Sequence, residues 1–451
     1  MLGKRAVVVG AGVGGLMAAE VLSRFFDDVL VLEKDTLPAN AETRMGVPQG
    51  AHVHSLLVQG RRNLELMFPG FTSELIDRGV VCSRGGLEFM THDEAGWFPK
   101  RDIQLPLMLM SRPLLEGAVR DFLKRNARVK IRENTRVEGW TFAGDVLAGV
   151  VASGGGADET IPADFVIDAT GRSGNSLSWL EAGGFGPVEE TKLEIGTGYA
   201  SAVFKKPPNW QSAVDGLSIS NRDPDTKGGF IFSVENDCWL ASLTGRFDQQ
   251  PPGDPDKFMA FAQSLCVPDF YDWISKGERI SPVKVYKAPI SRWRRYEKLT
   301  RHPERLLPLG DALAHVNPIF GQGMTLASAH VIGLWNILTE RAADSGKLNG
   351  IAKPYFEKVH GFTKTVWEGL ENVEYRYAGT KGERPADIDM RIAFSRGLRK
   401  LIEDDAEVHR LMGGIAHLVH PLEVIRRPDI VAKVKRIIQA GMTSPKAAGA
   451  Q

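Results

Sequence analysis

A glycine-rich turn between two apolar segments opens the sequence and limits the folds that it can adopt. The apolar run Ala6–Val9 leads into GAGVGG, a segment with helical periodicity follows, and a second apolar run, Val29–Leu32, ends at Glu33. This order predicts a strand, a tight turn, a helix and a second, parallel strand, with free amides at the start of the helix. Such amides, backed by the helix dipole, favour phosphate groups. We therefore expect a dinucleotide site.

The glycines of this turn have separate expected roles. Gly10 allows the tight turn, Gly12 lets the backbone approach a pyrophosphate, and Gly15 lets the helix pack closely on the strand. Glu33 follows Gly10 by 23 residues, close to where an acid holds the two ribose hydroxyls. A glycine-rich loop without a ligand is the alternative, because GxGxxG also occurs by chance. The strand before it, the helix after it and the acid favour nucleotide binding.

Composition excludes several classes of protein. The chain has 451 residues, of which 43% are hydrophobic and 25% charged, as in globular proteins with two or three domains. A net charge of +1 provides no field for nucleic acid. We expect no transmembrane helix, no signal peptide and no bound metal. Three scattered cysteines suit a reducing, cytoplasmic location and cannot form a disulfide framework; they are Cys82, Cys238 and Cys266.

A loop rich in glycine and proline follows the second apolar run. Arg44 in this loop can hold a phosphate or carboxylate with two hydrogen bonds, although a solvated surface arginine is the alternative. His52 and His54 lack a carboxylate or cysteine at metal-ligand spacing. We favour a structural or surface role for both, with contact to a substrate or nicotinamide as the alternative. A helix is expected near residues 56–68.

The middle of the chain predicts a mixture of short strands and one capped helix. Short strands are expected between Val80 and Leu109, followed by a helix with Ser111 as its cap. Arg112, at the start of that helix, could reach a phosphate or ribose. Residues 129–151 predict a small β-meander that continues through the turn SGGGAD.

Another apolar segment ends in a turn that presents polar groups, and a predicted hairpin follows it. Phe165–Ile167 is an apolar strand that ends in the sequence DATG, where Asp168 and Gly171 offer an acid and free amides. The hairpin formed by GGFIFSVEND and CWLASLTG predicts an antiparallel sheet. We expect one face of it to carry the following side chains, as plain core or as the floor of a hydrophobic pocket: Phe230, Phe232, Trp239 and Ala241.

A second strong pattern lies after residue 305. A strand over Leu306–Leu309 leads into a Gly-Asp turn, a loop with Pro318 and the sequence GQGM, and a long amphipathic helix follows from about Met324 to Arg341. Asp311 is placed to accept hydrogen bonds from a polyol chain. Amides at the helix start favour an anion, and the glycines let a flat ring rest on the backbone; they belong to Gly321, Gly323 and Met324.

The last hundred residues have a helical pattern with a polar break at AGTKGERPADID. The end of the chain resembles a basic amphipathic helix. Peripheral contact with a membrane surface is one interpretation. We favour packing of its apolar side on the body of the protein, with the basic side in solvent.

Three separated motifs together resemble the flavoprotein monooxygenases of the para-hydroxybenzoate hydroxylase type. They are GAGVGG with Glu33, DATG at residues 168–171, and the GD of residues 310–311 followed by a proline and GQG. The resemblance spans residues 7–338, and RMGVPQG is similar to the arginine-containing mobile loop of those enzymes. The segments GVPQGAHVHSLL and NPIFGQGM most resemble bacterial members of that group that act on isoprenoid, polyketide or aromatic compounds, including epoxidases.

The resemblance implies FAD as cofactor and NAD(P)H as co-substrate, without a separate nicotinamide domain. Residues implied near the chemistry are Pro318, Gly321 and Arg44, with the Pro318 carbonyl as a proton acceptor. Residues implied to bind the cofactors are Gly10, Gly12, Val13, Gly14, Gly15, Glu33, Lys34, Arg44, Arg112, Val137, Asp168, Gly171, Gly310, Asp311, Gly321, Gly323 and Met324.

The implied fold is α/β, with a Rossmann-like FAD-binding domain, a substrate domain with a mixed or antiparallel sheet, and a C-terminal helical region. The expected bounds are 1–180 for the FAD-binding domain, with the strands of 80–110 joining the substrate domain. The substrate domain follows at 181–295, the chain returns to the FAD-binding domain at 296–345, and the helical region is 346–451.

The resemblance also implies a reaction. The reduced flavin would take up O2 as a hydroperoxide and pass one oxygen atom to a hydrophobic substrate, by hydroxylation or epoxidation. Three alternatives remain: a reductase of isoprenoid double bonds, a halogenase, and a flavin-binding protein without turnover. The halogenase motif WxWxIP requires two tryptophans separated by one residue, and none of the nine tryptophans is so spaced. The substrate, the choice of NADH or NADPH and the oligomeric state stay open.

Overall fold

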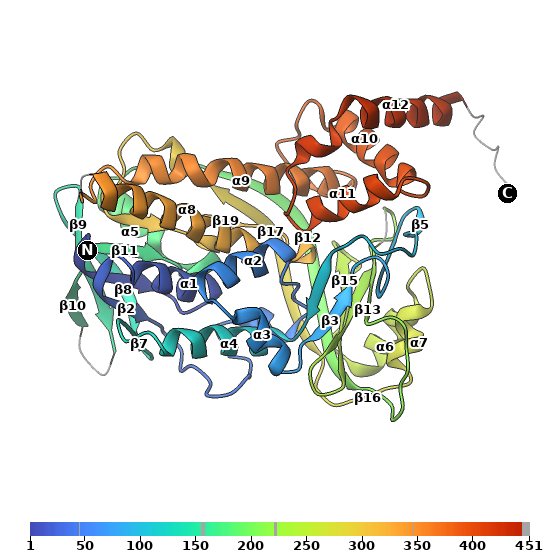
Figure 1. The fold of residues 1–451 in the computed structure, drawn as a ribbon, viewed down its shortest axis with the longest axis horizontal. Helices are drawn as coiled ribbons and strands as arrows, with labels where there is room; N and C mark the ends of the chain where they lie inside the picture. Colours follow the sequence, from blue (N-terminus) through green and yellow to red (C-terminus); the bar gives the residue numbers. More distant parts are fainter. Residues whose placement is uncertain (45, 155–157, 221–222, 345, 444–451) are drawn as a thin grey trace. The chain divides into compact units, whose positions relative to one another are not determined.

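The computed structural model describes residues 1–44, 46–154, 158–220, 223–344 and 346–443 (Figure 1). Its chain divides into two compact units, each assembled from three segments. Unit 1 comprises Met1–Val80, Met110–Glu194 and Ala288–Val366. Unit 2 comprises Val81–Leu109, Ile195–Lys287 and Trp367–Gln451. Strands β12 (Glu190–Lys205) and β17 (Lys284–Arg294) pass from one unit into the other.

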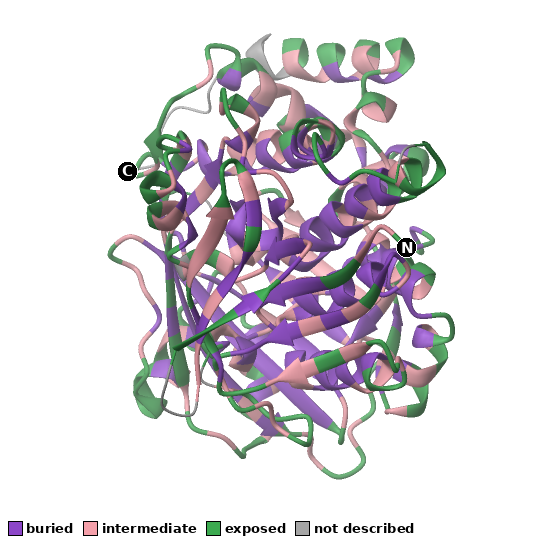
Figure 2. Ribbon diagram, turned by 90° about the vertical axis from the view of Figure 1, so that its left-hand side faces the viewer, coloured by how far each residue is buried: buried purple, intermediate pink, exposed green. Residues whose placement is uncertain are grey.

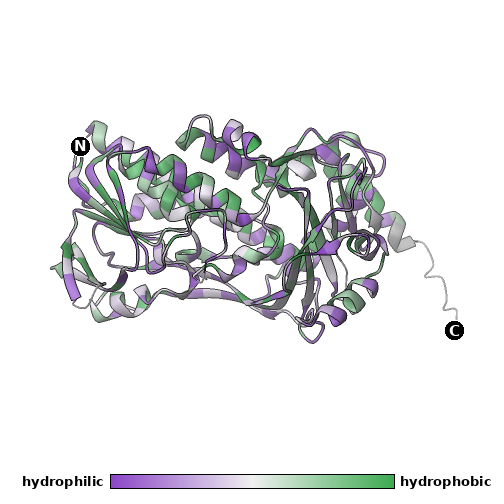
Figure 3. Ribbon diagram, turned by 90° about the horizontal axis from the view of Figure 1, so that it is seen from below, coloured by the Kyte–Doolittle hydropathy of each residue, from purple (hydrophilic) through white to green (hydrophobic). Residues whose placement is uncertain are grey.

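A five-stranded parallel sheet is the centre of unit 1. Its strand order is β18-β11-β1-β2-β7. Apolar runs buried on both faces are typical of parallel sheets covered by helices, and the sheet strands near the N-terminus are largely buried and hydrophobic (Figures 2 and 3). The strands are β1 (Gly3–Val9), β2 (Phe26–Leu32), β7 (Val129–Arg132), β11 (Phe165–Asp168) and β18 (Leu306–Pro308).

Helices of unit 1 pack around this sheet. The expected cap is present, since the Ser111 hydroxyl accepts from the Leu114 amide at 3.3 Å. Helices α1 and α2 both pack on α8, where Asn63 donates to the buried Ser328 hydroxyl at 2.9 Å. The helices are α1 (Val13–Leu22), α2 (Val58–Met67), α3 (Phe71–Asp77), α4 (Arg112–Lys124), α5 (Ser176–Ala182), α8 (Gly323–Asp344) and α9 (Ala352–Glu374), which continues into unit 2.

The meander expected over residues 129–151 is wrong at its first strand. β7 pairs in parallel with β2 and so belongs to the main sheet. A separate three-stranded antiparallel sheet contains β8 (Arg136–Ala143), β9 (Val146–Ser153) and β10 (Asp158–Pro162). Short apolar runs do not reveal their partners, and the edge of β2 provides one for β7. The centre of the SGGGAD turn, 155–157, lies outside the described residues.

Unit 2 contains most of a mixed sheet in which β12, β15, β14, β13, β4 and β5 follow one another. The expected short strands between Val80 and Leu109 are present, and β3 and β6 form their own pair. The new strands are β3 (Val81–Arg84), β4 (Phe89–Asp93), β5 (Gly96–Trp97), β6 (Pro106–Leu109), β13 (Gly216–Ile219), β14 (Gly228–Val234), β15 (Cys238–Arg246), β16 (Glu278–Arg279) and β20 (Lys381–Gly382).

The register of the β14–β15 hairpin corrects the expected face. Phe232 lies opposite Leu240, whereas Trp239 lies opposite Ser233. Because opposite residues of an antiparallel pair point to the same face, Phe230 and Phe232 share one face, and Trp239 and Ala241 the other. The second face is core: it packs with Phe258 and Phe270 of α6 (Pro255–Gln263) and α7 (Asp269–Ile274).

The C-terminal segment of unit 2 is helical, as expected. It contains α10 (Ile388–Leu401), α11 (Ala406–Ala416) and α12 (Pro428–Thr443), and the polar break lies between α9 and α10. Ile430 and Val434 of α12 are fully buried in a cluster with α10, so the apolar side of this basic helix does pack on the protein. Lys433 on α12 pairs with Asp405 at 2.7 Å.

Short 3-10 helices connect several of these elements: η1 (Pro48–Ala51), η2 (Gly171–Ser173), η3 (Tyr296–Lys298), η4 (Gly310–Ala312), η5 (Pro318–Phe320) and η6 (Leu422–Ile425). The two-residue strand β19 (Ala314–His315) pairs with the end of β17. Within the described residues, no helix combines the length and apolar character that a membrane crossing demands.

Candidate dinucleotide site

The carboxyl ends of four parallel strands meet at one edge of the sheet in unit 1. Val9 is in register with Leu32 on one side and with Asp168 on the other, and Asp168 is in register with Pro308. The Leu309 amide donates to the Asp168 carbonyl at 3.0 Å. The turns that follow these strands are therefore neighbours, although they are up to 300 residues apart in sequence. Ligands of open parallel sheets bind at this edge.

The glycine turn after β1 requires glycine at some positions and leaves space at another. Gly10 has φ +106°, and a Cβ there would lie 2.5 Å from the Ala169 carbonyl oxygen. A Cβ on Gly15 would lie 2.0 Å from the carbonyl oxygen of Gly10. A Cβ on Gly12 would meet nothing within 4 Å. Two of these glycines are thus needed for packing, whereas the third borders open space.

Helix α1 begins beside that space without a side-chain cap. Its N-cap is Gly12, which offers no side chain to its first-turn amides. Gly14 packs against the neighbouring strand end and helix, because a Cβ there would lie 3.0 Å from Leu309 and 3.3 Å from Ala327. Val13 is buried. Uncapped amides with the helix dipole behind them form a site that suits an anion.

Glu33 and Arg44 meet next to this helix start. Glu33 is 4% exposed, and its carboxylate accepts from the Ala11 amide at 2.8 Å and the Asp35 amide at 3.1 Å. Arg44 Nη1 lies 3.0 Å from both Glu33 Oε2 and Asp35 Oδ2. Burial alone would lower the pKa of Arg44, but Glu33, Glu116 and Asp35 outweigh it and raise that pKa. Lys34 is exposed.

A second group of charges on α4 extends this cluster. Glu116 accepts from Arg112 Nε at 2.8 Å and lies 3.6 Å from Arg44 Nε and 4.0 Å from Arg120. Burial would raise the pKa of Glu116, yet the charges of Arg112 and Arg44 hold it below its ordinary value. Arg120 also donates to the Pro38 carbonyl at 3.1 Å. Glu116 and Arg120 are absent from the residues predicted from the sequence, although their i, i+4 spacing after Arg112 marks them as one face of a helix.

Val137 is connected to the same strand end through its own backbone segment. The Thr135 amide donates to the Glu33 carbonyl at 2.8 Å, and the Asn134 amide donates to the Asp35 carbonyl at 3.2 Å. Val137 follows on β8 and is buried. The segment that leads into β8 is therefore hydrogen-bonded to the end of β2, two residues before Val137.

Asp311 lies at the other end of the candidate site, in η4. Its Oδ2 is 3.0 Å from His315 Nδ1, and a Cβ on Gly323 would lie 3.8 Å from its Oδ1. The Gly-Asp turn thus faces the start of α8. Burial would raise the pKa of Asp311, but His315, Arg112 and Arg172 outweigh it and hold the pKa below its ordinary value. The carboxylate stays an acceptor of hydrogen bonds.

The loop before α8 packs on the segment that follows η1. Gly321 has φ +63°, and a Cβ there would lie 2.9 Å from the Ser55 Cβ. The Pro318 carbonyl accepts from the Gly321 amide at 2.9 Å, which leaves its second lone pair available. Met324 follows in the first turn of α8 and is 9% exposed.

His52 and His54 lie in that neighbouring segment. His52 is buried, and His54 is half-buried with Nδ1 2.9 Å from the His52 carbonyl oxygen. Burial lowers the pKa of His52 to about 4. Burial, followed by the charge of Arg112, lowers the pKa of His54 to about 3. Both are neutral near pH 7. Across the described ranges, no group of three or more His, Cys, Asp or Glu side chains is arranged to hold a metal.

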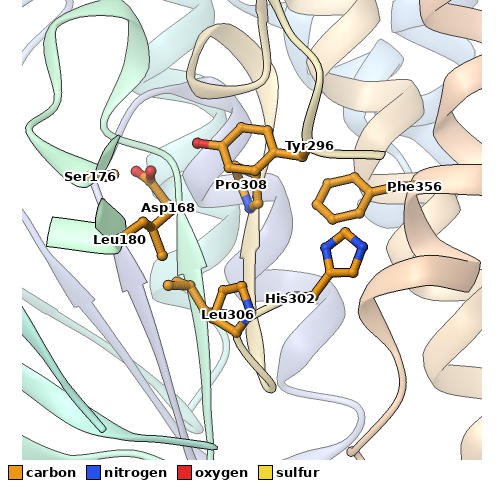
Figure 4. Close-up of a pocket in the computed structure, with 9 residues that line it drawn as sticks. Asp168, Ser176, Leu180, Tyr296, His302, Leu306, Pro308 and Phe356 are labelled. Carbon is orange, nitrogen blue, oxygen red and sulfur yellow. The ribbon is translucent and has the colours of Figure 1, made fainter. Parts of the chain in front are cut away.

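The Asp168 side chain lines a small cavity (Figure 4). Its Oδ1 accepts from the Thr170 amide at 3.0 Å and hydroxyl at 2.6 Å, which fixes the DATG turn. Gly171 has φ +76° and open space around its missing side chain. The other cavity residues are mostly apolar, with the Tyr296 ring reaching in; they are Ser176, Leu180, Tyr296, His302, Pro303, Leu306, Pro308 and Phe356.

A buried histidine that is absent from the residues predicted from the sequence supports the Gly-Asp turn. His330 on α8 is fully buried and accepts from the Gly310 amide at 3.0 Å through Nδ1. The sequence does contain a signal that could have identified His330. Its spacing from Ala327 and Leu334 places it on one otherwise apolar face of the helix after GQGM. A polar residue in such a stripe needs a partner in the core.

Comparisons with known proteins agree with this geometry. The model of a family described as an FAD binding domain matches residues 4–360. Protein Rv3254 of Mycobacterium tuberculosis is 32% identical over 386 residues, which are 83% of this chain and 81% of that protein.

Solved structures share the fold at low identity. The flavin-dependent brominase Bmp2 superposes with a TM-score of 0.67 at 13% identity, over 98% of this chain and 99% of that chain. PqsL of Pseudomonas aeruginosa, described as a probable FAD-dependent monooxygenase, has a TM-score of 0.61 at 16% identity, over 91% and 99% of the two chains.

Proposed function

Because the chain belongs to the FAD-binding family of the para-hydroxybenzoate hydroxylase type, and is thus an FAD-dependent monooxygenase, we propose that it inserts one oxygen atom of O2 into a hydrophobic small molecule. The reductant is NAD(P)H, and the substrate is an aromatic, isoprenoid or polyketide compound that is hydroxylated or epoxidised. A cytoplasmic location is part of the proposal. Cys82, Cys238 and Cys266 all lie in the described part of the chain and form no disulfide bond, which suits a reducing compartment.

The observation that carries the proposal is the convergence of the predicted cofactor residues at one sheet edge. The open space at Gly12 and the uncapped start of α1 suit a pyrophosphate. Glu33 at the end of β2 suits the adenosine ribose. Positive charge comes from Arg44, which pairs with Glu33, and from Arg112 at the start of α4. Asp311 suits the ribityl chain. The residues present therefore fit an extended FAD.

FAD supplies the redox chemistry when bound: it accepts a hydride from NAD(P)H and activates O2. The chain provides position and electrostatics. The start of α8 at Gly323 and Met324 carries the positive end of a helix dipole, which stabilises negative charge on a ring that lies against it. The Pro318 carbonyl keeps one lone pair that can accept a hydrogen bond from a protonated oxygen species, and the neutral His54 adds no charge nearby.

The decisive experiment is a substrate screen with the purified FAD-loaded protein. Aromatic, isoprenoid and polyene compounds are added singly, and NAD(P)H oxidation and O2 consumption are followed together. A monooxygenase shows stimulation by a substrate, matched O2 uptake and a product that carries one atom from 18O2. Parallel assays with NADH and NADPH identify the preferred reductant. The Gly12→Val variant is the matched control, because its cofactor space is filled.

Each alternative predicts a different outcome of this screen. A reductase of double bonds turns over with NAD(P)H without oxygen and gives a reduced product. A halogenase turns over only when halide is present. This chain shares a fold with the brominase Bmp2, but a shared fold does not imply a shared reaction, and the sequence lacks the tryptophans of the WxWxIP motif. A flavin-binding protein without turnover leaves FAD oxidised with every candidate ligand. Any of these results replaces the monooxygenase proposal.

A further inference from the structure

A chain of three buried hydrogen bonds connects helix α9 to the Gly-Asp turn. The Gly310 amide donates to His330 Nδ1 at 3.0 Å. His330 Nε2 lies 3.0 Å from the Thr363 hydroxyl, which donates to the Val359 carbonyl at 2.8 Å. His330 and Thr363 are both buried, at 0% and 1% exposure. All of these residues belong to unit 1.

The directions of these bonds determine the protonation of the histidine. A backbone amide can only donate, so Nδ1 must carry a lone pair. The single hydroxyl proton of Thr363 goes to Val359, so the hydroxyl accepts from Nε2–H. The neutral Nε2–H tautomer alone satisfies the whole chain. Burial agrees with this assignment, since it lowers the pKa of His330 to about 3.

The Gly310 amide is the sensitive point of this arrangement. Gly310 has φ +59°, a conformation that side chains rarely adopt, and a Cβ there would lie 3.2 Å from Ala327. Gly310 lies two residues after β18, one residue beyond the Leu309 amide, which still donates to the Asp168 carbonyl of the neighbouring strand, and its own amide donates to His330 instead. Without the His330 acceptor a buried donor would lose its partner, which costs more than an average hydrogen bond contributes. The turn would rotate that amide toward another acceptor.

We propose that His330 is a positioning residue for FAD binding, which fixes the Gly310 amide and thereby holds the Asp311 carboxylate toward the start of α8. This inference rests on the proposed role of Asp311 toward the ribityl chain. Thr363 acts one step further back, because it selects the tautomer that leaves Nδ1 free to accept. His330 touches no cofactor in this scheme and acts only through the turn.

Two amide substitutions separate the two ends of the imidazole. In His330→Asn the side-chain oxygen can occupy the place of Nδ1 and accept from Gly310. In His330→Gln the amide reaches the place of Nε2 and can bond Thr363 instead. His330→Leu removes both bonds, and Thr363→Val removes only the bond that selects the tautomer. The Asn and Gln variants are matched controls for each other, because each places one amide in the same core position.

FAD affinity is measured by titrating apoprotein and following flavin fluorescence, with the thermal midpoint of each apoprotein as the measure of folding. We expect His330→Leu and His330→Gln to raise the Kd for FAD about 10- to 100-fold, in line with an unsatisfied buried donor. His330→Asn should keep a Kd close to that of the unchanged protein. A merely structural role would lower the midpoints without separating Asn from Gln in FAD affinity, and would overturn the proposal.

A spectroscopic measurement tests the tautomer without relying on a variant that folds poorly. The unchanged holoprotein labelled with 15N-histidine should show several neutral imidazoles, and the one that belongs to His330 should carry its proton on Nε2 and should not titrate between about pH 5 and 8. Thr363→Val should shift this resonance and so assign it. A protonated Nδ1 or an imidazolium at this position overturns the proposal.

The outcome also separates this inference from the function on which it rests. If Asp311→Ala lowers FAD affinity while His330→Leu leaves it unchanged, the positioning role is wrong and the Asp311 assignment stands. If Asp311→Ala leaves FAD affinity unchanged while the Asn and Gln variants still differ, the turn acts on FAD through another group, and the ribityl assignment is wrong.

Discussion

Arg44 Nη1 lies 3.0 Å from Glu33 Oε2, and both side chains are about 5% exposed. Glu33 comes from the end of a strand and Arg44 from a loop, and the same carboxylate also accepts two backbone amides. The carboxylate proposed to bind ribose is therefore fixed by Arg44 and by two backbone amides before any ligand binds. A group that is fixed in advance loses little conformational entropy on binding, which increases affinity.

Arg44→Ala should destabilise the apoprotein by about 3 kcal/mol, because it leaves the buried Glu33 carboxylate without its cation. The free energy of unfolding is measured by urea titration. Arg5→Ala is the control, since the Arg5–Asp28 pair has a similar distance of 2.8 Å but is exposed. That variant should lose less than about 1 kcal/mol, and the loss should shrink in high salt. Equal losses in the two variants would contradict a buried pair at Arg44.

Gly12→Val and Gly15→Ala should fail in different ways. A Cβ on Gly12 meets nothing within 4 Å, so the valine variant should fold normally and purify without yellow colour, because its side chain occupies the proposed pyrophosphate space. A Cβ on Gly15 meets the Gly10 carbonyl oxygen at 2.0 Å, so even alanine should lower the apoprotein thermal midpoint. Flavin absorbance and thermal unfolding measure the two effects. Full FAD occupancy in Gly12→Val would contradict the assignment.

The sequence predicted the parts of this site that follow from local chemistry. The Gly10 turn, the strand end at Glu33 and the exit at Asp311 each combine a strand, a special residue and a helix within a short window. Such windows are governed by backbone conformation and helix polarity, which a sequence displays directly. The neighbouring positions of those three strand ends followed from the resemblance and agree with the observed register.

The errors concern partners that lie far apart in the chain. The alternation of β14 and β15 was visible, but their register decides that Phe232 and Trp239 face opposite sides, and a shift by one residue reverses every face. Strand β7 was expected in a meander because its partner, β2, lies about 100 residues earlier. His330 was not predicted for the same reason, since its role depends on a hydrogen bond from the Gly310 amide, 20 residues away in the sequence.

Asp311→Ala should lower FAD affinity about 10- to 100-fold, the loss expected for hydrogen bonds to a charged acceptor. Asp311→Asn should lose less, because the amide oxygen still accepts. The pKa of Asp311 is lowered, so the carboxylate stays charged and affinity should be constant from neutral pH down to pH 5. Titration of apoprotein with FAD measures the effect, with Asp28→Asn on β2, a half-buried aspartate paired with Arg5, as control. Unchanged affinity in Asp311→Ala would exclude the ribityl role.

His330→Asn should also flatten the pH dependence of stability. The pKa of His330 is about 3 in the folded protein and about 6.5 in an unfolded chain, so between these values only the unfolded state binds the proton. The free energy of unfolding therefore falls as pH decreases from 6.5, by up to about 1.4 kcal/mol per pH unit from this group. The variant lacks that contribution but keeps the other histidines whose pKa is lowered by burial, which act in the same direction; they are His52, His54, His92, His302, His409 and His417. Urea unfolding at a series of pH values should give converging curves for the two proteins as the pH falls, and parallel curves would show that His330 is not buried as a neutral group.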